Sequence, residues 1–229
     1  MKTLNKKLRN LLLTFLGVLM ITGCAVKVAL TSSYFQNQNK VGVLYTIDTI
    51  GFYKMGSQGL LDMAMTAGNK FQEPIRVVGG NFDPTMKIKG FYQGIFDSKG
   101  KSLKEIEFDY DEQTMSKFEK PSSSDKNYHK YDLTSLKEKG IDELLMVNVR
   151  YGLAVSYYGF IETGYFGHCT INSEIIDLTD NSVIYKDISA INEKIKGKWE
   201  TPPDYEPLKN SISVAVDKAI QLENGKLNK

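Results

Sequence analysis

Residues 141–189 carry the clearest structural signal in the chain and read IDELLMVNVRYGLAVSYYGFIETGYFGHCTINSEIIDLTDNSVIYKDIS. β-Branched and aromatic residues recur there between clusters of turn formers, which predicts three antiparallel strands at about 143–158, 165–177 and 182–189. Leu145, Val147, Val149 and Tyr151 recur at every second position near its start, as in a strand with one buried face. The turns are expected at residues 162–164 and 179–182, where Gly, Asp, Asn, Ser and Thr gather.

The flanking sequence predicts helices and further strands around this meander. A buried strand is expected from Val41, because apolar residues run without a break to Tyr45. Helical spacing and capping residues predict helices near 57–68, 84–98, 132–140 and 204–222. We expect residues 74–82 to be extended and to end at a Gly-Gly turn, and residues 103–110 to form a half-buried strand. We expect residues 113–129 to be a polar loop and residues 223–229 to be a frayed end. Together these elements predict an α+β fold, with a mixed β-sheet, a C-terminal antiparallel three-strand meander, and helices packed on it.

The N-terminus is typical of an exported protein. Four basic residues in MKTLNKKLRN precede the apolar run LLLTFLGVLMITGC, residues 11–24. This run is too short to span about 30 Å of hydrocarbon, which takes about 20 apolar residues. A basic start, a short apolar core and small residues at its end instead indicate a signal peptide.

The last four residues of this run, Ile21-Thr22-Gly23-Cys24, resemble the lipobox of bacterial lipoproteins. The resemblance implies that residues 1–23 are cleaved and that Cys24 is lipidated, which attaches the chain to a membrane. A chance cysteine in an ordinary signal, or an uncleaved anchor, is the alternative. Ala25 stands where an aspartate would favour the inner membrane, so the resemblance implies the periplasmic face of the outer membrane, with surface exposure as the other location. We expect residues 24–40 to be a polar tether and residues 41–229 a single globular domain.

Charge and cysteine content narrow the function. Without residues 1–23, Lys+Arg falls from 29 to 25 against 27 Asp+Glu, so the net charge changes from +2 to −2. No nucleic-acid partner is therefore expected. Cys169 is the only other cysteine; it is either a small buried residue on a strand or a thiol that reacts or forms an intermolecular bridge.

The sequence predicts no enzyme, and no cofactor or metal. The acids of residues 105–112 alternate on a predicted strand without the spacing of a calcium loop, which favours a solvated face. The two histidines are His129, expected at the surface, and His168. His168 and Cys169 are adjacent on a strand and so point to opposite faces, which excludes a common site without a bulge.

The predicted hairpin end is unusually aromatic. Its side chains either complete the core or form an exposed patch for a partner. The predicted contact residues are Tyr157, Tyr158, Phe160, Tyr165 and Phe166. We therefore expect an accessory or assembly lipoprotein that contacts the membrane through its lipid, and an envelope protein or a second copy through this hairpin. The alternative is a lipoprotein that binds a small molecule or glycan on its tyrosines.

The globular part also resembles known accessory lipoproteins of the periplasm. In LKEKGIDELLMVNVRYG a helix ends at a glycine before a strand, and SEIIDLTDNSVIYK contains an Asp-x-x-x-[Asn/Gly]-x-hydrophobic turn at 177–183. Both features are similar to the curli-secretion pore family and to lipoprotein activators of penicillin-binding proteins. The resemblance covers about residues 40–50 and 130–222. It implies an accessory role in the envelope.

Overall fold

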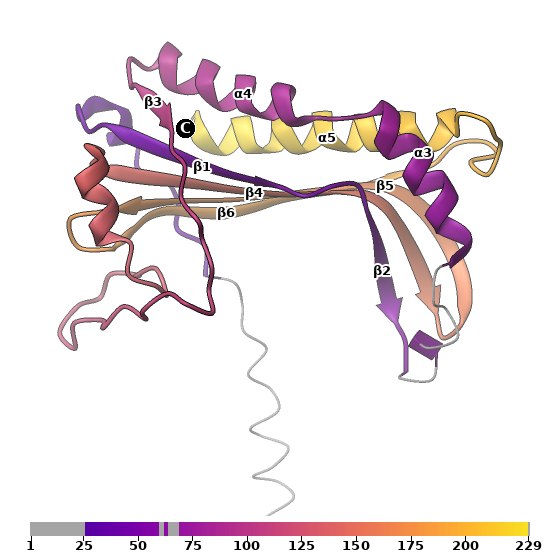
Figure 1. The fold of residues 1–229 in the computed structure, drawn as a ribbon, viewed down its shortest axis with the longest axis horizontal. Helices are drawn as coiled ribbons and strands as arrows, with labels where there is room; N and C mark the ends of the chain where they lie inside the picture. Colours follow the sequence, from indigo (N-terminus) through magenta and orange to yellow (C-terminus); the bar gives the residue numbers. More distant parts are fainter. Residues whose placement is uncertain (1–25, 60–61, 64–68, 229) are drawn as a thin grey trace, which may run out of the picture.

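The computed structural model describes residues 26–59, 62–63 and 69–228. Six strands form one mixed sheet in the order β3-β1-β4-β5-β6, with β2 also paired to β4 (Figure 1). The strands are β1 (Val41–Ile47), β2 (Gly51–Ser57), β3 (Leu103–Glu105), β4 (Glu143–Tyr158), β5 (Ile161–Asp177) and β6 (Val183–Lys194). The helices are α3 (Gln72–Asn81), α4 (Thr85–Ser98) and α5 (Glu206–Leu227), with 3-10 turns η1 (Tyr34–Gln36), η2 (Asn69–Phe71) and η3 (Thr134–Lys139). The predicted α+β fold with its C-terminal meander is confirmed.

Strand β4 organises the sheet because it pairs with β5 along one edge and with β1 and then β2 along the other. β5 is antiparallel to it throughout, while β1 and β2 lie parallel along residues 143–149 and 152–158 of its other edge. Gly152, at φ 150°, makes the bend between these halves. A Cβ on Gly152 would lie 2.0 Å from the carbonyl oxygen of Gly51, so no larger residue fits there. The far half of β4, β5 and β2 curves away from α4 and α5 (Figure 1).

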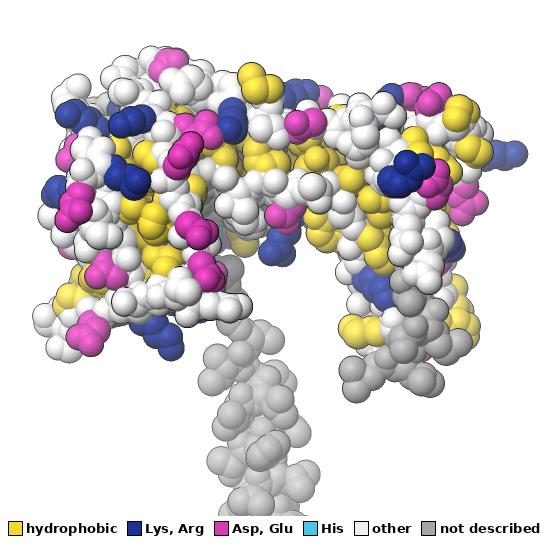
Figure 2. Space-filling model, viewed as in Figure 1, with side chains coloured by type: hydrophobic (Ala, Val, Ile, Leu, Met, Phe, Trp, Pro, Cys, Tyr) yellow, Lys and Arg dark blue, Asp and Glu magenta, His cyan; other side chains and the backbone are white. Residues whose placement is uncertain are grey.

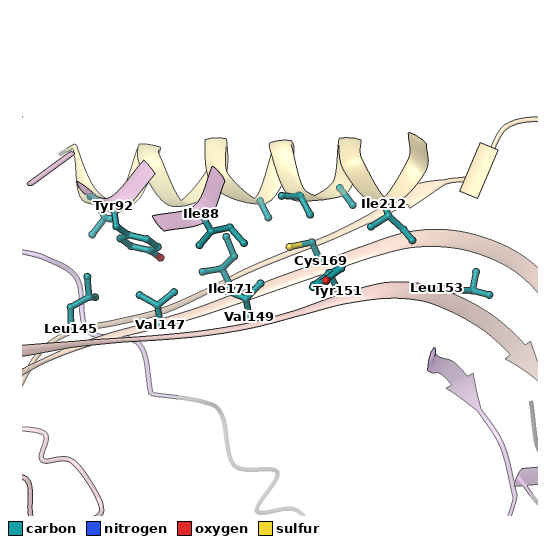
Figure 3. Packing of buried hydrophobic residues seen from close by; sticks show 14 of the residues in the cluster. Ile88, Tyr92, Leu145, Val147, Val149, Tyr151, Leu153, Cys169, Ile171 and Ile212 are labelled. Atoms are coloured by element: carbon teal, nitrogen blue, oxygen red, sulfur yellow. The ribbon is translucent and has the colours of Figure 1, made fainter. Parts of the chain in front are cut away.

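Helices α4 and α5 cover one face of the sheet. Their buried residues, among them Ile88, Tyr92 and Ile212, pack on Val147 and Ile171 of β4 and β5 (Figure 3). Burial of apolar surface of this kind is the main favourable term in folding, at about 25 cal/mol per Å². Helix α5 crosses β5 most closely at Gly167, where a Cβ would lie 2.3 Å from the backbone of Ser211.

The opposite face of the sheet, here called the open face, is covered at one end only. Residues 106–141 fold over that end and enclose a small second core that includes Leu44, Leu133 and Leu144. At the other end the curved hairpin forms a second projection. The space-filling view shows the hollow between these two limbs (Figure 2).

Residues 26–40, here called the N-terminal arm, pack against the domain. Val28 pairs with Lys186 on the outer edge of β6, and the buried Tyr34 donates a 2.7 Å hydrogen bond to Glu143. Asn39 donates a second hydrogen bond of 2.7 Å to the same carboxylate. The prediction of a free tether over residues 24–40 is therefore corrected for residues 28–40, because the polar side chains of the arm bind a buried carboxylate.

Several predicted elements differ from the structure. Residues 72–81 are helix α3, not an extended piece, and residues 51–57 are strand β2. The strand predicted at 103–110 ends at Glu105, because only Leu103–Glu105 pair with β1. The first meander turn lies at Gly159, in the left-handed conformation at φ 59°, and not at residues 162–164. The end of the chain stays helical to Leu227, because Glu223 is fully buried and accepts hydrogen bonds from Tyr185 and Ser189.

Other predictions agree with the structure or fall outside it. The helix predicted at 84–98 is α4, and the short helix at 132–140 is η3, which ends at Gly140 in the left-handed conformation. The helix predicted at 57–68 and the lipobox lie largely or wholly outside the described residues. In the described part of the chain, no helix is both long and apolar enough to cross a bilayer.

Candidate functional site

A cleft of about 600 Å³ lies on the open face, between the sheet and the segment 106–131. Its floor is a row of side chains across three strands. Thr46 on β1 lies opposite Asn148 on β4, which in turn lies opposite Asn172 on β5. The side-chain amides of Asn148 and Asn172 form no hydrogen bond with any residue that the structure describes. Two half-buried amides, each with a donor and an acceptor, are thus free to bind a ligand.

One wall of the cleft is a chain of hydrogen bonds through His129. Nδ1 of His129 lies 3.2 Å from Oε1 of Glu174, and Nε2 lies 3.1 Å from the Tyr110 hydroxyl. Lys186 donates a 2.9 Å hydrogen bond to Oε2 of Glu174. Because a carboxylate only accepts, Nδ1 carries a proton, and in the neutral imidazole Nε2 then accepts from Tyr110. His129 is only 8% exposed, so the expectation of a surface histidine is wrong.

The ionisation of this wall follows from burial and from its hydrogen bonds. Burial alone would raise the pKa of Glu174, but hydrogen bonds and charges from His129 and Lys186 outweigh it and lower that pKa. Burial, followed by the charges of Glu112 and Glu174, raises the pKa of Tyr110 to about 12. At neutral pH the wall therefore contains an ionised carboxylate and a tyrosine that keeps its proton.

The loop that carries His129 is fixed by one asparagine. Asn181 is fully buried and lies at φ 63°, a left-handed conformation that asparagine tolerates. Its side chain donates to the carbonyl oxygens of His129 and Tyr131 and accepts from the backbone N–H of Leu133. It belongs to the 177–183 turn. That turn thus holds the wall of the cleft in place.

Aromatic rings complete the wall. The ring centroids of Tyr110, His129 and Tyr131 lie 6.1 to 6.3 Å apart. The Tyr131 hydroxyl donates a 2.8 Å hydrogen bond to the Glu112 carboxylate. Tyr110 and Glu112 come from the acidic segment expected to form a solvated strand face. Of its acids, Glu105 pairs instead with Lys89 of α4, outside the cleft.

The thiol of Cys169 and the hydroxyl of Ser173 point to the helix face of the sheet, away from the cleft. Cys169 is fully buried on the helix side, and burial raises its pKa to about 12, so it remains a thiol. His168 is half-buried on the open face and bonds Asn192, which confirms that the two point to opposite sides. Ser173 is buried and shares a 2.6 Å hydrogen bond with Tyr92.

The residues predicted as partner contacts separate into two groups. Tyr158 and Phe160 are 75% and 62% exposed at the β4–β5 turn, beside Ile161, which is 55% exposed. Tyr157 is buried, and Tyr165 and Phe166 are half-buried, with Tyr165 packed 5.0 Å from Trp199. The turn residues 158–161, here called the tip, therefore present three large apolar side chains, and the other predicted contacts belong to the core or its edge.

Comparison with known proteins gives a limited result. No protein-family model matches the chain, and no curated protein matches its sequence. Among solved structures, a DUF330-family protein from Xanthomonas campestris aligns with 89% of this chain and 92% of its own, at 10% identity and a TM-score of 0.40. A neuraminyllactose-binding hemagglutinin homolog from Helicobacter pylori covers 85% and 87%, at 11% identity and a TM-score of 0.38. A hypothetical protein from Chlamydia trachomatis covers 83% and 98%, at 8% identity and a TM-score of 0.35. All three are bacterial proteins, and their structural similarity to this chain is weak.

Proposed function

We propose that the chain is a non-catalytic lipoprotein of a bacterial envelope that binds a neutral, hydroxyl-rich ligand, such as a glycan segment, in the cleft. The lipobox at Cys24 supports the anchor, and Ala25 supports the periplasmic face of the outer membrane. The observation that carries the ligand is the pair Asn148 and Asn172, whose amides face each other at the floor without partners in the described structure. Unpaired amides beside aromatic rings suit hydroxyl groups and the apolar faces of sugars.

The charges of the cleft favour a neutral ligand. Glu174 is neutralised by Lys186, and the exposed Glu112 lies 3.5 Å from Lys130. Asp187, at the edge of the cleft, pairs with Lys27 of the arm and Lys226 of α5. Because each acid has a basic partner, the cleft has no strong field of either sign to attract an ionic ligand.

Its carboxylates also argue against glycoside cleavage. Hydrolysis needs a carboxylic acid whose pKa is raised so that it can protonate the leaving group. The pKa of Glu112 is lowered, first by its hydrogen bond from Tyr131, and the pKa of Glu174 is lowered as well. We therefore propose recognition without catalysis.

Protein docking at the tip is the less favoured reading. Three partly exposed side chains offer roughly 400 Å² together, about half of the ~800 Å² that each partner buries in a stable interface. The tip is also convex, so it cannot supply the remaining area by itself. Docking of a protein partner or of a second copy there stays a prediction.

Calorimetric titration with neutral oligosaccharides tests the cleft. The full chain in detergent would be titrated with chito- and malto-oligosaccharides, with a sulfated oligosaccharide as the charged comparison. Changing Asn148 and Asn172 together to leucine removes two hydrogen bonds of about 1 kcal/mol each, so affinity should fall about 30-fold. Thr170→Val, next to this pair on β5 and outside the cleft, is the matched control. The proposal fails if no neutral oligosaccharide binds, or if the leucine variant binds as well as the parent.

A further inference from the structure

The docked arm limits how far the domain can lie from its lipid. Val28 is already paired to β6, and Cys24 precedes it by four residues. Four residues span at most about 14 Å when fully extended. A free tether from Cys24 to Lys40 would instead reach over 50 Å. Lipidation at Cys24, proposed above, therefore holds β6 close to the bilayer surface.

The arm and the tip lie on the same side of the sheet. The first described residues lie beneath β6, on the open face, and the β4–β5 hairpin curves toward that side, away from α4 and α5 (Figure 1). Figure 2 shows hydrophobic side chains near the lower end of this limb. A bilayer within reach of the lipid on Cys24 thus meets the tip before it meets any helix.

The chemistry of the tip suits the interfacial layer of a membrane. Tyr158, Phe160 and Ile161 are its exposed side chains, and tyrosine is enriched where a bilayer meets water. The backbone N–H and C=O of Gly159, in the middle of its turn, are both bonded within the protein. The Gly159 N–H donates a hydrogen bond to the carbonyl oxygen of Ser57. The Gly159 carbonyl oxygen accepts a 2.9 Å hydrogen bond from the side-chain amide of Gln58. This matters because an unpaired backbone group is costly in lipid.

The acids beside the tip are paired as well. Glu162 forms a 2.6 Å ion pair with Lys70 and accepts a hydrogen bond from the Tyr165 hydroxyl. Asp62 accepts a 2.9 Å hydrogen bond from the backbone N–H of Gly59. We propose that the tip inserts Tyr158, Phe160 and Ile161 into the bilayer that holds the lipid of Cys24, so that the open face and its cleft lie toward the membrane. A fluid bilayer needs no complementary surface, which suits a convex patch too small for a protein interface.

Depth-dependent fluorescence quenching tests the insertion. Palmitate-labelled full chain carrying Phe160→Trp would be reconstituted in vesicles of phosphatidylethanolamine and phosphatidylglycerol that contain a lipid with a nitroxide on its acyl chain. The tryptophan introduced at the tip should show blue-shifted emission and lose most of it to the nitroxide. The parent supplies the background, because its single tryptophan, Trp199, is buried. Met86→Trp is the matched control, since Met86 is 80% exposed on α4, across the sheet.

Each outcome decides one step. Quenching of the Phe160→Trp protein but not of the Met86→Trp protein supports the insertion. Absence of palmitate label refutes the anchor on which the inference rests. If the labelled protein shows no quenching of the tip tryptophan in vesicles, the insertion is refuted but the anchor is not. If that tryptophan is then shielded from water only in native membranes, the tip binds a protein partner. The oligosaccharide titration measures binding to the cleft in detergent, without a bilayer. Its result therefore tests the proposed function independently of the insertion of the tip.

Discussion

The buried ion pair beneath the N-terminal arm gives the sharpest stability prediction. Lys101 and Glu143 are 3% and 0% exposed, and Nζ of Lys101 lies 3.0 Å from Oε2 of Glu143. Lys101→Met removes the cation and leaves a buried carboxylate with only the hydrogen bonds of the arm. Removing one partner of a buried pair costs about 3–5 kcal/mol. We expect the free energy of unfolding to fall by that amount.

The second step of this prediction is a rescue. Adding Glu143→Leu removes the stranded charge, and apolar replacement of a whole buried pair is often neutral or stabilising. The buried Tyr34 hydroxyl then loses its acceptor, which costs about 1–3 kcal/mol, and the half-buried amide of Asn39 loses the same acceptor where water replaces it. The double variant should therefore be more stable than Lys101→Met by about 1–3 kcal/mol. Urea unfolding followed by the fluorescence of Trp199 measures both. A single variant that loses less than about 1 kcal/mol, or a double variant less stable than the single one, refutes the reasoning.

Two further predictions concern pH and the bend of the sheet. The lowered pKa of Glu174 contributes stability that is present above the unfolded pKa of about 4.3 and is lost as the pH falls through the folded pKa. Glu174→Gln should therefore flatten the acid side of a plot of melting temperature against pH. An unchanged slope would contradict this. Gly152→Ala should destabilise the protein by at least about 3 kcal/mol, because at φ 150° the new Cβ would clash with the backbone of Gly51. Gly90→Ala, on the exposed side of α4 with open space around it, should instead stabilise the protein by about 0.5–1 kcal/mol. Thermal unfolding compares the two variants, and equal effects would exclude a steric cause.

The meander could be predicted because its signal is local. Alternation places Leu145, Val147 and Val149 on one face whatever the rest of the chain does. The turn was misplaced because Gly159 and Gly164 are both plausible breaks, and only pairing with β5 chooses between them. Helix α3 was missed for a similar reason: Gly79 and Gly80 suggest a turn, but Gly79 lies against Ile50, where a Cβ would approach to 2.5 Å.

The arm and the cleft depend on contacts between distant residues. Nothing near Tyr34 or Asn39 shows that Glu143, more than a hundred residues later, accepts their hydrogen bonds. The cleft joins His129, Asn148 and Glu174 from a loop and two strands. One local signal was present, because the polar positions of the two strands alternate onto a single face. That pattern could have indicated the open face, but not the loop that closes it.

The docked arm also changes how a ligand would be found. The lipid anchor proposed at Cys24 would keep the domain in a thin layer over one leaflet, because only four residues separate that anchor from the pairing of Val28 with β6. A ligand fixed in that same leaflet meets the cleft at an effective concentration on the order of millimolar. Weak intrinsic affinity then suffices for occupancy, while a free molecule of the same chemistry gains no such advantage. With the anchor and the cleft ligand proposed above, the pairing of Val28 with Lys186 would thus favour ligands that reside in the same leaflet over free molecules of the same chemistry.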